Sequence, residues 1–421
     1  MTQDTSDIHV LAPQKRRGAS LLTRLTMMVA LAIAIAWFFS TDLVQRWIIA
    51  RRSTHDLEQT VRLAPDTPWP FYELGVRYAR QRRLPEAVKL FERARQAAPE
   101  SSEIRLALGK AYLFSGDPGA ATPELKRATE LDSRNEPAFR YLATADRLTH
   151  AKPAALDAAR RATELDPRDA EAWYQYGELF TSEDGDENNG RPFLKKAAEL
   201  APSDGVYAYA YGRSLADGSQ FADAVPFLRK AVRALPNDPN THFFLGLSLH
   251  RSGGGDSTEM VDELTKAVQL APADFKGHFE LGNVLEERSR FAEALPEFES
   301  AAKLNPSLGE IWFHLARMAD RAGQPDKAAM ARARFAAIRK YHAEFVSLIN
   351  QLKANPTSAT LQLKIGEVLE KQDKPKQAAL QYLDVLSREP NNVQAQRLFE
   401  QLRQRMHWSK VPATTGDGGA P

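Results

Sequence analysis

Small residues recur inside apolar helical stretches at a nearly constant spacing along most of the chain. Each one follows a large apolar residue, most often leucine. The first eight are spaced 34, 34, 34, 35, 34, 36 and 34 residues apart: Gly75, Gly109, Ala143, Gly177, Gly212, Gly246, Gly282 and Ala316. A ninth member, Gly366, comes after a longer interval. The pattern predicts one helical unit repeated along the chain.

Each unit contains a second helix, marked by two alanines seven residues apart, as at Ala87 and Ala94. Proline cannot continue a helix interior, so we expect the recurring prolines in the turns between units. They are Pro65, Pro99, Pro167, Pro202, Pro236, Pro272, Pro306, Pro356 and Pro390, with Ser133 in place of one member. We expect the small residues to let paired helices approach closely, and large residues such as Phe71 and Trp173 to fill the space between them.

The spelling of these units resembles the tetratricopeptide repeat. Two close matches are "FYELGVRYARQRRLPEAVKLFERARQAAP" from Phe71 and "HFELGNVLEERSRFAEALPEFESAAKLNP" from His278. The resemblance covers roughly residues 54–392 in about nine copies. It implies an all-α fold, a right-handed superhelical solenoid of antiparallel helix pairs.

The repeats place the array at residues 68–392, after a juxtamembrane helix or half-repeat at 45–67. A capping helix is expected at 393–408 and a disordered tail at 409–421. The interval from Pro306 to Pro356 is 50 residues, which predicts one long helix near 326–353. Its apolar stripe is expected to pack on the last repeat, and the alternative is that it binds a partner or a second copy: Phe335, Ile338, His342, Phe345, Ile349 and Leu352.

An uncharged run from Leu25 to Thr41 follows the basic N-terminal tail at residues 1–24. A bilayer core needs roughly 17–25 mostly apolar residues, so residues 25–44 predict a single transmembrane helix. The charge bias around it predicts a cytoplasmic N-terminus and an array outside the cytoplasm, on the periplasmic side of an inner membrane. The alternative is a cleaved signal peptide and a soluble periplasmic or secreted protein.

Composition limits the chemistry. The chain has no cysteine, which excludes disulfides, thiolate metal sites and a cysteine nucleophile. The net charge of +2 divides into +4 for residues 1–52 and −2 for the rest, so no basic stripe predicts nucleic-acid binding. We find no catalytic or phosphate-binding motif and expect a non-catalytic protein that needs no cofactor or metal.

Three further features have structural interpretations. His242 and His278 fall at corresponding first-helix positions and are expected to be packing residues. The acidic stretch 181–190 is similar to the start of a calcium loop, but its glycine and final residue are misplaced, so a polar turn is expected. Glu286 and Glu287 are expected on a solvated polar face.

In tetratricopeptide arrays, the first helices line a concave groove that holds protein or peptide segments, so the resemblance implies a binding scaffold. The Lys and Asn pair with which some family members bind a C-terminal carboxylate is not assembled. Aromatic residues recur at one groove position, and polar residues recur one turn later. The candidate binding residues are Tyr72, Tyr174, Tyr209, Phe243, Phe279 and Phe313, together with Lys110, Glu178, Arg213, Asn283 and Arg317. We expect protein partners, in envelope-associated complex assembly.

Overall fold

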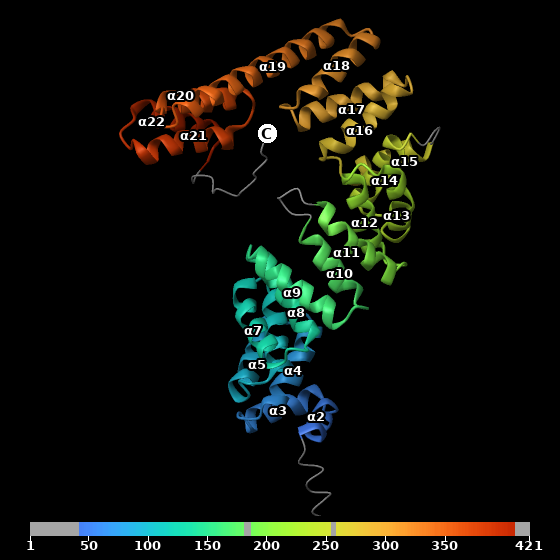
Figure 1. The fold of residues 1–421 in the computed structure, drawn as a ribbon, viewed down its shortest axis with the longest axis vertical. Coiled ribbons are helices and arrows are strands. Elements are labelled where there is room, and N and C mark those ends of the chain that lie inside the picture. Colours follow the sequence, from blue (N-terminus) through green and yellow to red (C-terminus); the bar gives the residue numbers. More distant parts are fainter. Residues whose placement is uncertain (1–41, 181–186, 254–257, 409–421) are drawn as a thin grey trace, which may run out of the picture. The chain divides into compact units, whose positions relative to one another are not determined.

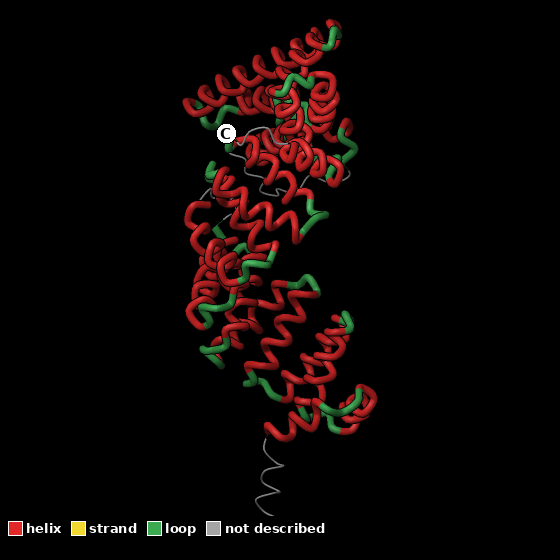
Figure 2. The backbone as a smooth tube through the Cα atoms, turned by 90° about the vertical axis from the view of Figure 1, so that its right-hand side faces the viewer, coloured by secondary structure: helices red, strands yellow, loops and turns green. Residues whose placement is uncertain are grey.

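A computed structural model describes residues 42–180, 187–253 and 258–408. Within these ranges the chain consists of helices and short turns and contains no strand (Figures 1 and 2). The chain divides into two compact units, residues 1–165 and 166–421. In Figure 1, the first unit runs from blue to blue-green and the second from green to red. The prediction of an all-helical array of helix pairs is confirmed.

The first unit holds a leading pair of short helices and three full pairs: α2 (Asp42–Ala50), α3 (Thr54–Leu63), α4 (Pro68–Arg80), α5 (Leu84–Ala97), α6 (Ser102–Phe114), α7 (Pro118–Leu131), α8 (Glu136–Leu148) and α9 (Lys152–Leu165). The second unit begins with four pairs: α10 (Ala170–Glu178), α11 (Glu187–Leu200), α12 (Gly205–Asp217), α13 (Phe221–Ala234), α14 (Pro239–Arg251), α15 (Thr258–Leu270), α16 (Phe275–Glu287) and α17 (Phe291–Leu304). It ends with α18 (Gly309–Arg321), α19 (Pro325–Ala354), α20 (Ala359–Lys371), α21 (Pro375–Arg388) and α22 (Val393–Arg405).

The two helices of each pair meet at the recurring small residue. A Cβ atom added to Gly75 would lie 2.8 Å from the ring of Phe91, and one added to Gly212 would lie 2.8 Å from Leu228. Phe91 and Leu228 are both buried. The small residues therefore allow the close helix approach that the sequence predicts.

In eight of the helix pairs that the structure describes, the turn between the two helices places one residue in the left-handed region. Glycine stands there in some turns, as at Gly116 with φ 80°, and other residues stand there in the rest, as at Ser289 with φ 56°. The next N–H then donates to the carbonyl five residues earlier, as from Arg290 to Leu285 at 2.9 Å. This geometry satisfies a carbonyl at the helix end. His407, with φ 54°, repeats the turn after α22, so α22 ends as the first helix of a pair does.

A side-chain hydrogen bond holds many turns between pairs. The proline carbonyl accepts from the side chain six residues later: Arg105 to Pro99 at 2.7 Å, Trp173 to Pro167 at 3.0 Å, His242 to Pro236 at 3.0 Å, His278 to Pro272 at 3.2 Å, Trp312 to Pro306 at 2.9 Å and Gln396 to Pro390 at 2.8 Å. A carbonyl only accepts, so Nε2 carries the hydrogen in both histidines.

These contacts settle two expectations from the sequence. His242 and His278 are buried packing residues, as predicted. Trp173 is only half-buried: it spans its turn and stacks on Phe193, with 6.0 Å between ring centroids. The expectation that Trp173 fills the space between helices is therefore too strong, since its indole N–H has to reach a carbonyl at the surface.

Helix α19 has 30 residues and contributes to two buried clusters. Ala328 and Ala331 near its start belong to the cluster of α18, and Leu348 near its end belongs to the cluster of α20 to α22. Phe335 of the predicted stripe contacts Phe313, with 5.7 Å between ring centroids, and Phe345 packs against the second cluster. The stripe is therefore half-buried within its own chain, except at exposed His342.

Two predicted segments fall partly outside the described residues. The membrane span at 25–44 overlaps them only at 42–44, where α2 begins. Of the helices that the structure describes, none combines the length and the apolar character needed to cross a bilayer. The polar turn expected at 181–190 is shorter than predicted, since α11 already begins at Glu187.

Candidate partner-binding grooves

The candidate residues lie on first helices of both units. Tyr72 (α4) and Lys110 (α6) belong to the first unit. The others lie on α10, α12, α14, α16 and α18 of the second unit. Most are half-buried, and only Phe313 and Arg317 are exposed. Each unit therefore presents its own part of the predicted surface.

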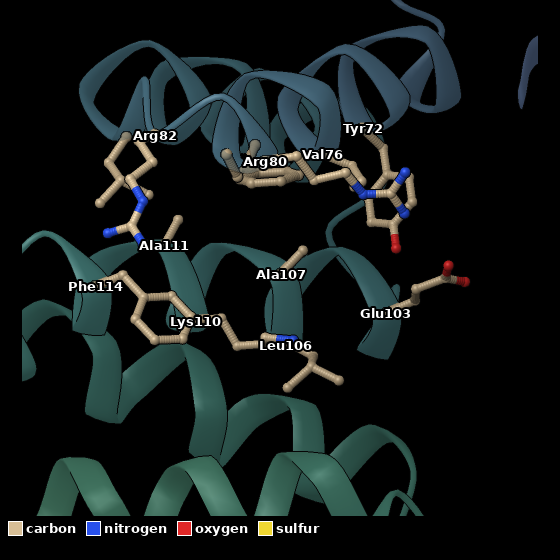
Figure 3. Close-up of a pocket in the computed structure, with 13 residues that line it drawn as sticks. Tyr72, Val76, Arg80, Arg82, Glu103, Leu106, Ala107, Lys110, Ala111 and Phe114 are labelled. Atoms are coloured by element: carbon tan, nitrogen blue, oxygen red, sulfur yellow. The ribbon is translucent and has the colours of Figure 1, made fainter. Parts of the chain in front are cut away.

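A groove of about 630 Å³ lies between the first helices α4 and α6 (Figure 3). Tyr72 and Lys110 both line it, so the structure brings together the two candidates of this unit. The other principal lining residues are Val76, Arg80, Arg82, Phe91, Glu103, Leu106 and Phe114. Phe114 is 62% exposed, which is unusual for a phenylalanine side chain. The groove therefore offers an apolar surface with charged groups at its edges.

The Glu103 end of this groove is neutralised within the chain. Glu103 pairs with Arg46, whose guanidinium lies 4.0 Å from the Trp69 ring centroid. Burial raises the pKa of the Tyr72 phenol, and the negative charge of Glu103 raises it further. Tyr72 therefore stays protonated, and its hydroxyl is engaged by the hydrogen bond to Glu103.

The cations of the groove are not neutralised in this way. Arg80, Arg82 and Lys110 form no ion pair with any carboxylate among the residues that the structure describes. The Lys110 ammonium lies 4.7 Å from the ring centroid of Tyr141. These side chains are therefore available to an external acceptor.

The aromatic row of the second unit is tied into the packing. Tyr174 contacts Tyr207 at 5.3 Å between ring centroids, and Tyr209 contacts Phe244 at 5.9 Å. Two further row members, Phe243 and Phe279, also pack against the buried cluster of this unit. Only Phe313 is largely accessible, at 45% exposure. Most rings of this row therefore contribute to the packing between helices.

The charged candidate residues of the second unit form ion pairs within the chain. Arg213 lies 3.1 Å from Glu178 and 3.8 Å from Asp217. Arg317 pairs with Glu286, which is only 6% exposed and also lies 2.6 Å from Nδ1 of His314. The expectation that Glu286 is solvated is wrong, because the His314 ring and the Arg317 guanidinium of the next pair cover it. Asn283 differs: its buried side-chain oxygen has no hydrogen-bond partner in the described residues.

A second buried carboxylate is held in the same way. Glu280 is 4% exposed and lies 2.6 Å from His250 Nδ1 and 3.3 Å from Arg251. Burial raises the pKa of Glu280, but the hydrogen bonds and charges of His250 and Arg251 outweigh it and lower the pKa. The hydrogen bond to Glu280 raises the pKa of His250, and Glu287 at 2.9 Å adds to the effect. No group of three or more His, Asp or Glu side chains in the described ranges could hold a metal ion.

Sequence reasoning missed Arg80, Arg82, Glu103 and Phe114 as groove residues. A signal for Phe114 was present in the repeat frame. The last residue of α4, α12, α14, α16 and α18 is charged, whereas that of α6 is phenylalanine and that of α8 is leucine. An aromatic residue at a position that the frame usually gives to a charge marks a surface with another use.

Three segments match models described as tetratricopeptide repeat: residues 78–145, 170–204 and 279–341. The curated proteins contain no match to the chain. Solved structures that resemble parts of it include MamA, which is 25% identical over 38% of this chain and 94% of that chain, with a TM-score of 0.36.

YrrB, described as a TPR protein with an unusual peptide-binding site, is 17% identical over 44% of this chain and 95% of that chain, with a TM-score of 0.38. The pilF protein of Pseudomonas aeruginosa is 13% identical over 56% of this chain and 100% of that chain, with a TM-score of 0.46. Matched segments lie in both units, and helix pairs with tight glycine contacts fill them. The three segments that match the family models therefore carry tetratricopeptide repeats.

Proposed function

We propose that this chain is a non-catalytic scaffold that binds segments of partner proteins in grooves lined by its first helices. One observation carries the proposal: the groove between α4 and α6 is open, has a volume of about 630 Å³ and contains an exposed phenylalanine. Apolar surface beside charged groups is typical of sites that bind an extended or helical segment.

The first unit is the better candidate for the main binding site. In the second unit most of the aromatic row packs against the buried cluster, and Arg213 and Arg317 are already paired. In the first unit, Phe114 and three cations are available. Phe313 remains the candidate of the second unit that is accessible to a partner.

The proposal includes a place in the cell. Residues 25–44 would anchor the chain in an inner membrane with the repeats outside the cytoplasm, where it would serve in the assembly of envelope-associated complexes. The uncharged run after a basic tail supports the anchor. The alternative is a soluble periplasmic or secreted binding protein, released by cleavage of the same segment.

A site-specific crosslinking experiment tests the binding site. A photocrosslinking amino acid is placed at Phe114 in the full-length protein, and in parallel at Leu63 on α3. Both are exposed apolar side chains of the same unit, at 62% and 85%, but only Phe114 lines the groove. We expect partners crosslinked in native membranes from position 114 and not from position 63. Equal yields at both positions would contradict the proposal.

A further inference from the structure

The cations of the groove between α4 and α6 differ from the candidate cations of the second unit in how they are neutralised. In the second unit, Arg213 and Arg317 each have a carboxylate partner from a neighbouring first helix. In the groove between α4 and α6, Arg80, Arg82 and Lys110 have none within the described ranges. The single carboxylate of that groove, Glu103, is itself occupied by Arg46. The groove therefore carries an uncompensated positive charge.

The charge and the apolar surface lie close to each other. Figure 3 shows Arg82 and Phe114 at one end of the groove, and Tyr72 and Glu103 at the other. Phe114 is in edge contact with Tyr141, at 6.3 Å between ring centroids, and its remaining surface faces solvent. A cation at a helix C-terminus, such as Arg80, also complements the helix dipole. Lys110 lies further inside its helix and Arg82 lies beyond the end of α4, so the dipole does not account for the whole set.

We infer that the groove between α4 and α6 binds an acidic protein segment that also carries a large apolar side chain. This inference rests on the proposed function and names the class of its partner. The apolar side chain would pack on Phe114 and Leu106, and the carboxylates would face Arg80, Arg82 and Lys110.

The exposure of the cations determines how the acidic residues of the bound segment contribute to binding. Arg80 and Arg82 are exposed, so their attraction is screened by salt and acts mainly on the association rate. Carboxylates that reach them gain charge-assisted hydrogen bonds, which are the stronger kind. We therefore expect binding to weaken as the salt concentration rises. The binding that remains at high salt should come from the apolar contact.

Selection from a random dodecapeptide phage library on the full-length protein tests the inference. Peptides are retained only if they crosslink to the photocrosslinking residue at position 114. We expect them to be enriched in Asp and Glu together with Phe, Leu or Trp. Replacing those acids by Asn and Gln should weaken binding about tenfold. Crosslinked peptides without acid enrichment, or acidic peptides without any apolar residue, would overturn the inference and leave the proposed function standing.

Charge-reversed variants supply the control. Arg80→Glu/Lys110→Glu should weaken the selected peptides by about tenfold or more and shift a new selection toward basic peptides. Lys89→Glu/Lys126→Glu reverses two exposed lysines on the second helices α5 and α7, and binding should change less than about threefold. Circular dichroism checks that both variants fold. Equal effects would overturn the inference, whereas a protein that captures no peptide at position 114 would refute the proposed function itself.

Discussion

Single glycines are the least tolerant positions in the helix pairs. A Cβ atom on Gly212 would stand 2.8 Å from Leu228 Cγ and 3.3 Å from the Leu228 backbone nitrogen. The backbone cannot yield as a flexible side chain can. We predict that Gly212→Ala costs roughly 1–3 kcal/mol of unfolding free energy through overpacking, and that Gly212→Leu costs more. Urea unfolding measures this change.

Gly309→Ala is the matched control in the same unit. Its added Cβ would meet its nearest neighbour, Ile338, at 3.4 Å, which is ordinary van der Waals contact. Alanine also has the higher helix propensity, so this variant should be neutral or gain up to about 1 kcal/mol. Equal losses of unfolding free energy in the two variants would show that the contact between Gly212 and Leu228 is not as tight as described.

His250 makes the second unit sensitive to pH. Its folded-state pKa is raised above 6.5, chiefly by the hydrogen bond to Glu280 and then by Glu287, while burial acts against them. The stabilisation is therefore fully present below about pH 6.5 and is lost as pH rises through the raised folded-state value. Arg251 also faces Glu280 and keeps its charge throughout.

We predict that the melting temperature falls over this window in the wild type and falls less in His250→Gln. Titration of the His250 ring by NMR gives the folded-state pKa directly. A titration at or below the unfolded value would contradict the prediction. So would an identical pH dependence of melting in both proteins.

The charged contacts explain why some residue predictions succeeded and one was wrong. His242 and His278 were recognised as packing residues because the repeat frame puts large side chains there. Glu286 was expected in solvent because its neighbours along the helix are polar. Its partners, His314 and Arg317, lie 28 and 31 residues away, about one repeat later. Opposite charges at one-repeat spacing are visible in the sequence, but only the fold shows that they face each other.

Among the elements, α19 has an unusual position because it serves two buried clusters. Its start packs with α18 and its end with α20 to α22, and Arg339 and Lys340 between them are exposed. A helix transmits rigidity only while its hydrogen bonds continue, and proline in the interior costs roughly 3 kcal/mol or more. The two clusters should therefore depend on the middle of this helix.

We predict that Lys340→Pro speeds amide hydrogen exchange in α20 to α22, while α16 and α17 remain protected. Lys340→Ala removes the same charge and keeps the helix, so its exchange should match the wild type. Exchange that rises equally in α16 and α20 would mean that the unit unfolds as one cooperative block. Unchanged exchange in α20 to α22 would mean that the last cluster does not depend on α19.

At the scale of the whole molecule, the helix pairs follow from periodicity alone. The spacing of Gly75, Gly109 and their successors predicted where pairs form, because a small residue is needed where the two helices of a pair cross closely. The groove was predicted only in part. Tyr72 and Lys110 were identified, but Arg82 and Phe114 lie at or beyond helix ends, outside the two first-helix positions from which the candidates were taken.

Membrane topology is also a property of the whole chain. We predict that residues 25–44 span a membrane with the basic tail inside, because an uncharged run follows Lys15, Arg16, Arg17 and Arg24. A periplasm-active reporter fused after Pro421 should be active, and a cytoplasm-active reporter at the same place should be silent. Activity of only the cytoplasmic reporter would contradict the topology. The size of the mature N-terminus separates the anchor from a cleaved signal.

The hydrogen bond across the turn between pairs has a consequence for how such chains diverge. Arginine, tryptophan, histidine and glutamine all donate to the proline carbonyl six residues before them. These turns share a hydrogen-bond donor at the same position, but the type of residue that supplies the donor differs from turn to turn. An alignment scored by residue identity would treat these positions as unrelated, whereas one scored by donor position would superimpose them. Distant repeats of this kind are therefore better recognised by the chemistry that each position supplies than by its letter.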